Sequence, residues 1–283
     1  MSKGESAVSD APATIWQRAW RRLGSLGAWA GYAFLVVPSL IVIPISLNGS
    51  SELQFPPRDL SLGLFAQFFN ERSWWGAAVQ SGWVGLLTAV LSMLLAFPAA
   101  YALARSSFKG KQLLEILLLS PMLVPVMVLG LGLYMQMSAL RMVDTTLGMV
   151  LAHSVLVTPY AFVSIMAGLR HVDPALETVA MLMGASRWRI VTRVVVPQIK
   201  APLLIGALFS FLISFDEVVV AYFLTGPATQ TLPVKMYSAI RWEVSPVLAS
   251  VSTLLTLLSL GFCLLIMALQ RRAEAAERIT KPE

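Results

Sequence analysis

The chain has 283 residues, of which 57% are hydrophobic and only 13% are charged, and its net charge at pH 7 is +6. Soluble domains carry about twice that share of charged residues, so the composition excludes an ordinary soluble fold and indicates a lipid bilayer as the solvent. A nucleic-acid partner is not expected, because the chain lacks basic residues interleaved with aromatics on a soluble face. The single cysteine, Cys263, excludes an intrachain disulfide and a cysteine-based metal site.

Six apolar stretches are long enough to cross a bilayer, which takes about 20 mostly apolar helical residues. They lie at about residues 28–47, 75–104, 113–137, 147–168, 202–223 and 246–270. We therefore predict an all-α integral membrane protein with six transmembrane helices, because outer-membrane strands would alternate in polarity over about ten residues. The second stretch exceeds the bilayer thickness, so we expect it to tilt or to project on one side.

The segments around these stretches predict the topology. A long polar segment, residues 1–27, precedes the first stretch, which we therefore expect to be retained rather than cleaved as a signal peptide. With the N-terminus inside, the inner segments carry sixteen of the 21 basic residues and the outer segments carry five. Basic residues near span ends are retained in the cytoplasm, so both termini are predicted to be cytoplasmic. Prolines within the stretches predict kinks: Pro38, Pro98, Pro121, Pro125 and Pro159.

The inner segment between the fourth and fifth stretches is unusually long and partly apolar. Asp173 is a plausible N-cap with Pro174 at the first helical position, and Gly184 interrupts the short helix that follows. Its apolar face, at three- and four-residue spacing, comprises Leu176, Val179, Ala180 and Met183. After Ser186, a second helix with several arginines is predicted to run to Pro197. Spacing alone leaves two interpretations open, namely a helix resting in the membrane interface and a docking knob for a cytoplasmic partner.

This segment resembles the signature loop of importer-type ABC permeases, which reads E-A-A, three residues, G, nine residues, I-x-L-P. The matching residues are Ala180, Gly184, Val194, Val196 and Pro197. Thr178 and Val179 stand where the signature has Glu and Ala, and Glu177 lies one place earlier. The resemblance covers roughly residues 75 to 270, including the run from Gly85 to Arg105.

The resemblance implies a coupling helix that transmits closure of an ATPase dimer to the membrane subunits. The residues implied to contact or support the ATPase are Glu177, Ala180, Met183, Gly184, Ala185, Ser186 and Pro197. The chain has no G-x-x-x-x-G-K-[ST] phosphate loop, so we expect it to bind no cofactor, with ATP and Mg bound by the partner ATPase. Neither catalytic residues nor a metal site is expected in this chain.

Two adjacent acids, Asp216 and Glu217, lie inside the fifth apolar stretch, where an unpaired charge is costly. As neighbours on a helix they point about 100° apart, and a span that begins near Pro202 on the cytoplasmic side places them in its outer half. They either attract a cationic substrate, pair with arginines of a second permease, or cap an irregular helix end. Tyr222 and Trp242 border this region, where they could enclose an amine or belong to the aromatic belt.

The run from Ser214 to Val220, with the later Thr225-Gly226-Pro227 and Leu232-Pro233, is similar to spermidine/putrescine-type permeases. It implies import of polyamines or a related organic cation in a bacterial inner membrane, although opine permeases are similar here. The implied partners are a second permease subunit, an ATP-binding subunit dimer, an external binding protein and the lipid bilayer. The alternative class is an ion-gradient-driven secondary transporter, against which stands the lack of a repeat.

The domain division expected from the resemblance has four parts. A cytoplasmic tail occupies 1–27, the first helix and an external loop occupy 28–74, the permease domain occupies 75–270, and a second cytoplasmic tail occupies 271–283.

Overall fold

The structure, a computed structural model, describes residues 15–49, 54–243, 245–261 and 264. These residues form helices and irregular segments, with one isolated antiparallel bridge between Asn48 and Leu60. The chain divides into two compact units, Met1–Phe68 with Pro246–Glu283 and Phe69–Ser245. The predicted tail 271–283 and the first half of the tail 1–27 lie outside the described residues.

The first unit contains the first predicted span and the described part of the sixth. Helix α1 (Ile15–Ser46) includes an apolar segment, Leu23–Ser46, that is exposed as far as Ile41 and partly buried beyond it, where Ser46 is fully buried. Helix α2 (Gly63–Asn70) begins in this unit, where the Ser250 hydroxyl donates to the Leu64 carbonyl at 3.1 Å. An apolar helix runs from Val247 to Gly261, and the sixth predicted span extends beyond it into residues that are not described.

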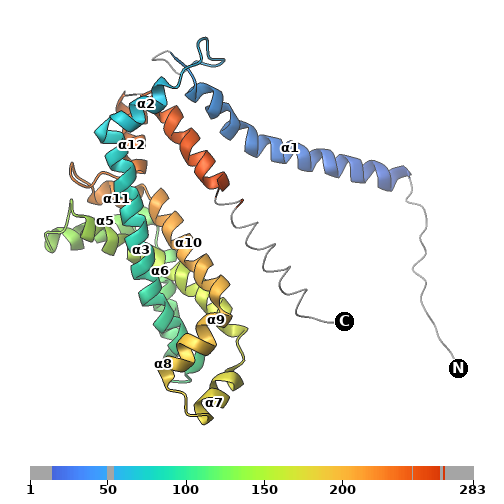
Figure 1. The fold of residues 1–283 in the computed structure, drawn as a ribbon, viewed down its shortest axis with the longest axis vertical. Helices are drawn as coiled ribbons and strands as arrows, with labels where there is room; N and C mark the ends of the chain where they lie inside the picture. The colour runs from blue at the N-terminus through green and yellow to red at the C-terminus, as the bar shows by residue number, and fades with distance from the viewer. Residues whose placement is uncertain (1–14, 50–53, 244, 262–263, 265–283) are drawn as a thin grey trace. The chain divides into compact units, whose positions relative to one another are not determined.

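Three long helices form the scaffold of the second unit: α3 (Arg72–Arg105), α6 (Thr146–Arg170) and α10 (Lys200–Asp216) (Figure 1). Helices α3 and α6 confirm the second and fourth predicted spans, with ends within three residues of the expected ones. Glycine lets these helices approach closely, since a Cβ on Gly168 would lie 2.6 Å from Cγ of Pro202.

The core of the second unit follows this helix packing. Its largest fully buried side chains come from α6 and its neighbours, and they include Phe162, Met149, Ile165, Leu169 and Ile199. Helix α6 supplies six of the twelve largest because it lies against both α3 and α10. It is therefore the central element around which the rest of the unit is arranged.

The prediction of one continuous helix at 113–137 was wrong. Helix α4 (Lys111–Leu119) passes into a 3-10 turn, Ser120–Met122, and α5 (Val126–Ala139) follows after a bend of 98°. Pro121 and Pro125 lie at the bend, where neither can donate the backbone hydrogen bond that an α-helix requires. The same prolines were expected only to kink the span.

The fifth predicted span, 202–223, is also not a single helix. Helix α10 ends at Asp216, and the short helix α11 (Val219–Leu224) begins after a two-residue break. Helix α12 (Leu232–Ser238) and the π-helix η3 (Ala239–Glu243) complete the unit. The expectation that the two acids lie 100° apart on one helix was therefore wrong, because the helix stops between them.

Length and composition support a membrane protein. Among the described residues, three helices are long and apolar enough to cross a membrane, namely α3, α6 and the Leu23–Ser46 part of α1. Two bent pairs pass the same test, the first formed by α4 and α5 and the second by Arg187–Gln198 with α10.

Candidate functional site

The segment between α6 and α10 folds as predicted, into two helical pieces. Helix α7 (Pro174–Leu182) comes first, and α8 (Arg187–Ile190), the π-helix η2 (Val191–Val195) and α9 (Val196–Gln198) follow as one continuous run. We call Pro174–Gln198 the loop helices. Asp173 caps α7 by accepting a hydrogen bond from the Ala175 N–H at 2.8 Å, which confirms the predicted N-cap.

Gly184 separates the two pieces and adopts a left-handed conformation with φ of +82°. The turn is closed by the Ala185 N–H, which donates to the Ala180 carbonyl at 3.0 Å. Ser186 then starts the second piece by accepting from the Arg189 N–H at 3.4 Å. A side chain at position 184 would meet nothing within 4 Å, so glycine is needed for its backbone conformation rather than for space.

The outward side of the loop helices is apolar and exposed. Leu182 and Met183 at the end of α7 are 82% and 83% exposed. Exposed apolar patches of this kind mark contact sites for other proteins or for membranes. Of the predicted contact residues, Met183 lies in this patch, while Ala180 is half-buried.

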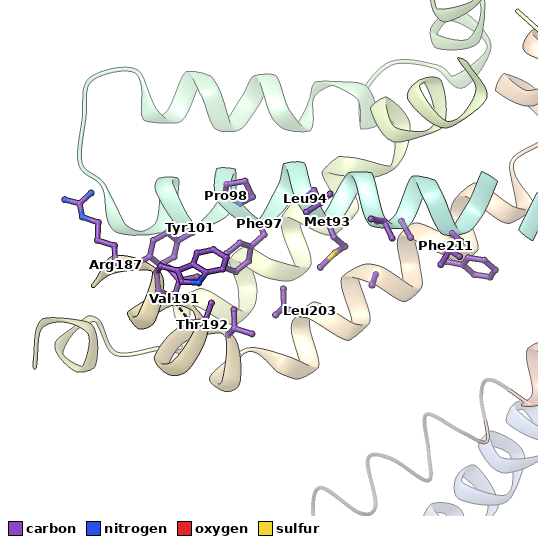
Figure 2. A pocket seen from close by; sticks show the side chains of 16 residues that line it. Met93, Leu94, Phe97, Pro98, Tyr101, Arg187, Val191, Thr192, Leu203 and Phe211 are labelled. Atoms are coloured by element: carbon purple, nitrogen blue, oxygen red, sulfur yellow. Dashed lines mark hydrogen bonds between the residues drawn. The ribbon is translucent and has the colours of Figure 1, made fainter. Parts of the chain in front are cut away.

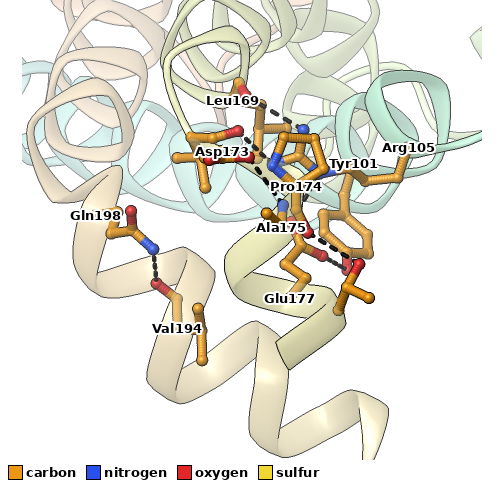
Figure 3. Close-up of polar contacts among 11 residues, drawn as sticks. Tyr101, Arg105, Leu169, Asp173, Pro174, Ala175, Glu177, Val194 and Gln198 are labelled. Carbon is orange, nitrogen blue, oxygen red and sulfur yellow. Dashed lines mark hydrogen bonds and ion pairs between the residues drawn. The ribbon is translucent and has the colours of Figure 1, made fainter. Parts of the chain in front are cut away.

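Glu177, the only acid within α7, points inward instead (Figure 3). Its Oε1 accepts from Arg105 Nε and its Oε2 accepts from the Tyr101 hydroxyl, both at 2.6 Å. Arg105 also donates through Nη2 to the Val172 carbonyl at 3.1 Å and through Nη1 to the Leu169 carbonyl at 3.5 Å. One guanidinium therefore joins the end of α3 to the end of α6 and to α7. A direct ATPase contact by Glu177 stays a prediction.

We call Tyr101, Arg105 and Glu177 the junction triad. The sequence prediction did not assign a role to Tyr101 or Arg105. The sequence does contain a signal for this contact. Tyr101 and Arg105 are four residues apart, so they share one face of a helix, and an acid of the loop helices could pair with that face. The pairing itself depends on where α7 packs, which the spacing does not specify.

Pro197 lies in α9, at the end of the run that begins with α8. The backbone there widens into the π-helix η2, and the Gln198 amide donates to the Val194 carbonyl at 2.7 Å (Figure 3). Because a proline has no N–H, it cannot continue a regular hydrogen-bond ladder. The run then turns by 80° into α10.

The two acids of the fifth stretch lie at the break between α10 and α11, at the other end of α10 from the loop helices. Glu217 Oε1 accepts from the Val220 N–H at 2.8 Å, so this carboxylate caps the start of α11. Asp216 is exposed, and within the described part of the chain no basic side chain forms an ion pair with it. The capping alternative thus holds for Glu217, while contact of either acid with a substrate stays a prediction.

The aromatic residues near this break are engaged with a cation of the chain itself. Tyr222 contacts Tyr237 edge to face at 5.6 Å, and Arg241 donates to the Tyr237 hydroxyl at 2.6 Å. The Arg241 guanidinium also lies 6.0 Å from the centre of the Trp242 ring. An amine at Trp242 would therefore compete with Arg241. No three metal-binding side chains come together in the described residues.

Asp144 anchors the loop that follows α11, a role that the sequence prediction missed. Its Oδ1 accepts from the Gly226 N–H at 3.0 Å, from the Thr229 N–H at 3.1 Å and from the Thr229 hydroxyl at 2.8 Å. Its Oδ2 accepts from the Ala228 N–H at 3.4 Å. The partners are more than 80 residues away, so no local pattern could have indicated them.

Comparison with known proteins places this geometry in a family. Residues 92–279 match the family described as binding-protein-dependent transport system inner membrane component. The spermidine/putrescine transport system permease protein PotC of Haemophilus influenzae is 28% identical over 244 residues, which is 85% of this chain and 93% of PotC. The putrescine transport system permease protein PotI of Escherichia coli is 28% identical over 232 residues, covering 80% of this chain and 82% of PotI.

A solved bacterial ABC transporter that imports the acidic polysaccharide alginate contains a chain of the same fold, with a TM-score of 0.69 at 12% identity. The match covers 91% of this chain and 98% of that one. The matched family spans two thirds of the sequence and includes the loop helices. The chain therefore belongs to the binding-protein-dependent transport system inner membrane components.

Proposed function

We propose that this chain is a permease subunit of an ATP-driven importer of polyamines. In this proposal it pairs with a second permease, an ATP-binding subunit dimer docks beneath both permeases, and an external binding protein delivers the substrate. The substrate class rests on the relatives PotC and PotI, whose names specify spermidine and putrescine. The mechanism rests on one observation, which is that the junction triad joins α7, whose end carries the exposed apolar patch, to the adjoining ends of α3 and α6.

The proposed topology has six spans with both termini in the cytoplasm. The basic residues support it, because the junction triad and the arginines of the loop helices lie at one end of the second unit and the acids of the α10–α11 break lie at the other. The positive end is then cytoplasmic. The broken third and fifth spans each count as one crossing.

Closure of the ATPase dimer would push on the exposed face of α7 and on Met183. Glu177 binds Arg105, and Arg105 binds the Leu169 carbonyl of α6 and the Val172 carbonyl just beyond its end. The displacement would therefore reach both α3 and α6. ATP and Mg belong to the partner ATPase in this scheme. In this scheme the loop helices of this chain transmit the movement, and its membrane helices form part of the substrate pathway.

Reconstitution tests the proposed function. Proteoliposomes containing this chain, its sister permease and the ATPase should accumulate radiolabelled spermidine when the external binding protein and ATP are both present. Uptake that continues without ATP and collapses with an ion gradient would identify a secondary transporter and overturn the proposal.

Replacing Gly184 with tryptophan should abolish most ATP-dependent uptake while the protein still inserts into membranes. A side chain at φ of +82° costs roughly 1–2 kcal/mol, and the bulk would stand in the proposed docking contact. ATPase retention on the permease, measured by pull-down, should fall together with uptake.

The matched control is Gly110→Trp. Gly110 also has a positive φ, +95°, with nothing within 4 Å of its Cβ position, but it lies before α4 rather than in the loop helices. Equal losses in both variants would mean that backbone strain, and not docking, accounts for the effect.

Changing Asp216 to Asn and Glu217 to Gln together should lower polyamine uptake about tenfold with ATPase docking unchanged. The glutamine oxygen still accepts from the Val220 N–H, so the start of α11 is kept while both charges are lost. The control is Glu115→Gln, since Glu115 has only a 4.0 Å contact with an exposed arginine. Normal uptake by the double variant would assign these acids a structural role alone.

A further inference from the structure

An apolar groove runs along the second unit between α3 and the segment from α8 to α10. Its volume is about 930 Å³, and Figure 2 shows Arg187 at one end and Phe211 at the other. On α3 the groove extends from Leu86 to Tyr101, sixteen residues that span roughly 22 Å of helix. One leaflet of a bilayer is roughly 15 Å deep in hydrocarbon, so a whole acyl chain fits along the groove.

A smaller, more polar cavity adjoins the Arg187 end. Its volume is about 540 Å³, and it shares Tyr101 and Arg187 with the apolar groove. Arg105 and Glu177 also line it, and they neutralise each other as an ion pair. Arg187 has no acidic partner among the described residues, so this cavity carries one uncompensated positive charge.

We propose that the groove and the adjoining cavity bind one anionic phospholipid, with an acyl chain in the groove and the phosphate against Arg187. The placement in the cytoplasmic leaflet rests on the topology proposed above. The apolar groove leads into a polar cavity that carries one positive charge. In the same way, the apolar acyl chain of a phospholipid leads to its charged headgroup. The guanidinium provides donors suited to a phosphate.

A helix of the sister permease is the competing occupant. The basic side chain at the polar end of the groove favours the lipid, because a phosphate needs a cation there and the apolar face of a helix does not. Trp188, an exposed aromatic in the groove lining near Arg187, suits the interface between hydrocarbon and headgroups.

The bound lipid would connect α3 with the second piece of the loop helices. Val191 and Thr192 line the groove from the π-helix η2, which is a rare local geometry that recurs at functional sites. The acyl chain would therefore pack on the side of η2 that faces α3. Lipid composition would then set how firmly α8 and η2 follow movements of α3.

Photolabelling of the purified full chain in nanodiscs tests this proposal. The probe is phosphatidylglycerol with a diazirine on one acyl chain, and labelled residues are mapped by mass spectrometry. Labels are expected along Leu86–Leu94 and Leu203–Phe211, displaced by unlabelled phosphatidylglycerol but poorly by phosphatidylcholine. Arg187→Gln should lower this labelling about tenfold, since it removes a charged hydrogen bond.

The control is Arg193→Gln, an exposed arginine of η2 outside the groove, which should label normally. Ala207→Phe, which fills the groove, should reduce labelling with Arg187 intact. Equal labelling of groove and α1 residues, or no effect of Arg187→Gln, would overturn the proposal. A photoreactive amino acid in place of Leu94 provides a second test. Its crosslinking to the sister permease in the complex would also overturn the proposal. The readout is lipid binding, so it is independent of whether the chain transports polyamines.

Discussion

Arg105→Ala should abolish coupled uptake and lower the thermal stability of the permease by about 10 °C. The substitution leaves the Glu177 carboxylate buried with only Tyr101 as a partner, and it frees the carbonyls of Leu169 and Val172. Removing one member of a buried ion pair costs roughly 3–5 kcal/mol. Each kcal/mol corresponds to about 2–4 °C for a chain of this size. Thermal unfolding and proteoliposome uptake measure the two effects.

The double variant Arg105→Ala with Glu177→Ala separates stability from coupling. It removes the orphaned charge, so most of the lost thermal stability should return. Uptake should not return, because α7 is no longer tied to α3 and α6, and ATP hydrolysis should continue without stimulation by the loaded binding protein. Recovery of both quantities would show that the triad contributes stability only.

Asp144→Ala should lower the unfolding temperature by about 5–10 °C and expose the loop at 225–231 to proteases. Three backbone N–H groups and one hydroxyl lose their acceptor, and each unsatisfied, partly buried donor costs roughly 1 kcal/mol or more. Asp144 also has a φ of +56°, which alanine adopts at a cost. Limited proteolysis and thermal unfolding of the purified chain are the measurements.

Two further variants separate the two causes. Asp144→Asn keeps an oxygen for Gly226 and Thr229 and tolerates a positive φ, so it should be close to wild type. Asp144→Gly keeps the backbone conformation but removes the acceptor, and it should be nearly as protease-sensitive as the alanine variant. If the glycine variant were as resistant as wild type, the hydrogen bonds of Asp144 would not hold this loop.

The parts of the fold that the sequence predicted well are those decided by local chemistry. The ends of α3 and α6 follow from hydropathy, and α7 follows from Asp173, Pro174 and the positive-φ requirement at Gly184. These signals act within a few residues, so a single sequence contains them in full.

Features decided by contacts between distant segments were missed or wrong. The hydropathy of 202–223 is continuous, yet α10 stops at Asp216 because Glu217 provides a new cap for α11. The junction triad joins residues more than 70 positions apart, and Asp144 reaches more than 80 positions along the chain. The side chain of Glu177 points inward because it forms an ion pair with Arg105. Helical spacing within α7 does not reveal this distant partner.

The interruption of the fifth predicted span also changes the electrostatics at the end of α10 that carries Asp216. The last four carbonyls of an α-helix have no partner within the helix, so α10 ends in a cluster of partial negative charge close to Asp216. Backbone dipoles cannot be protonated. Under the proposed function, a diamine at this end of α10 would be attracted to these oxygens even at a pH where a carboxylate is neutral. An unbroken helix through Leu224 would instead have used the same oxygens in its own hydrogen bonds.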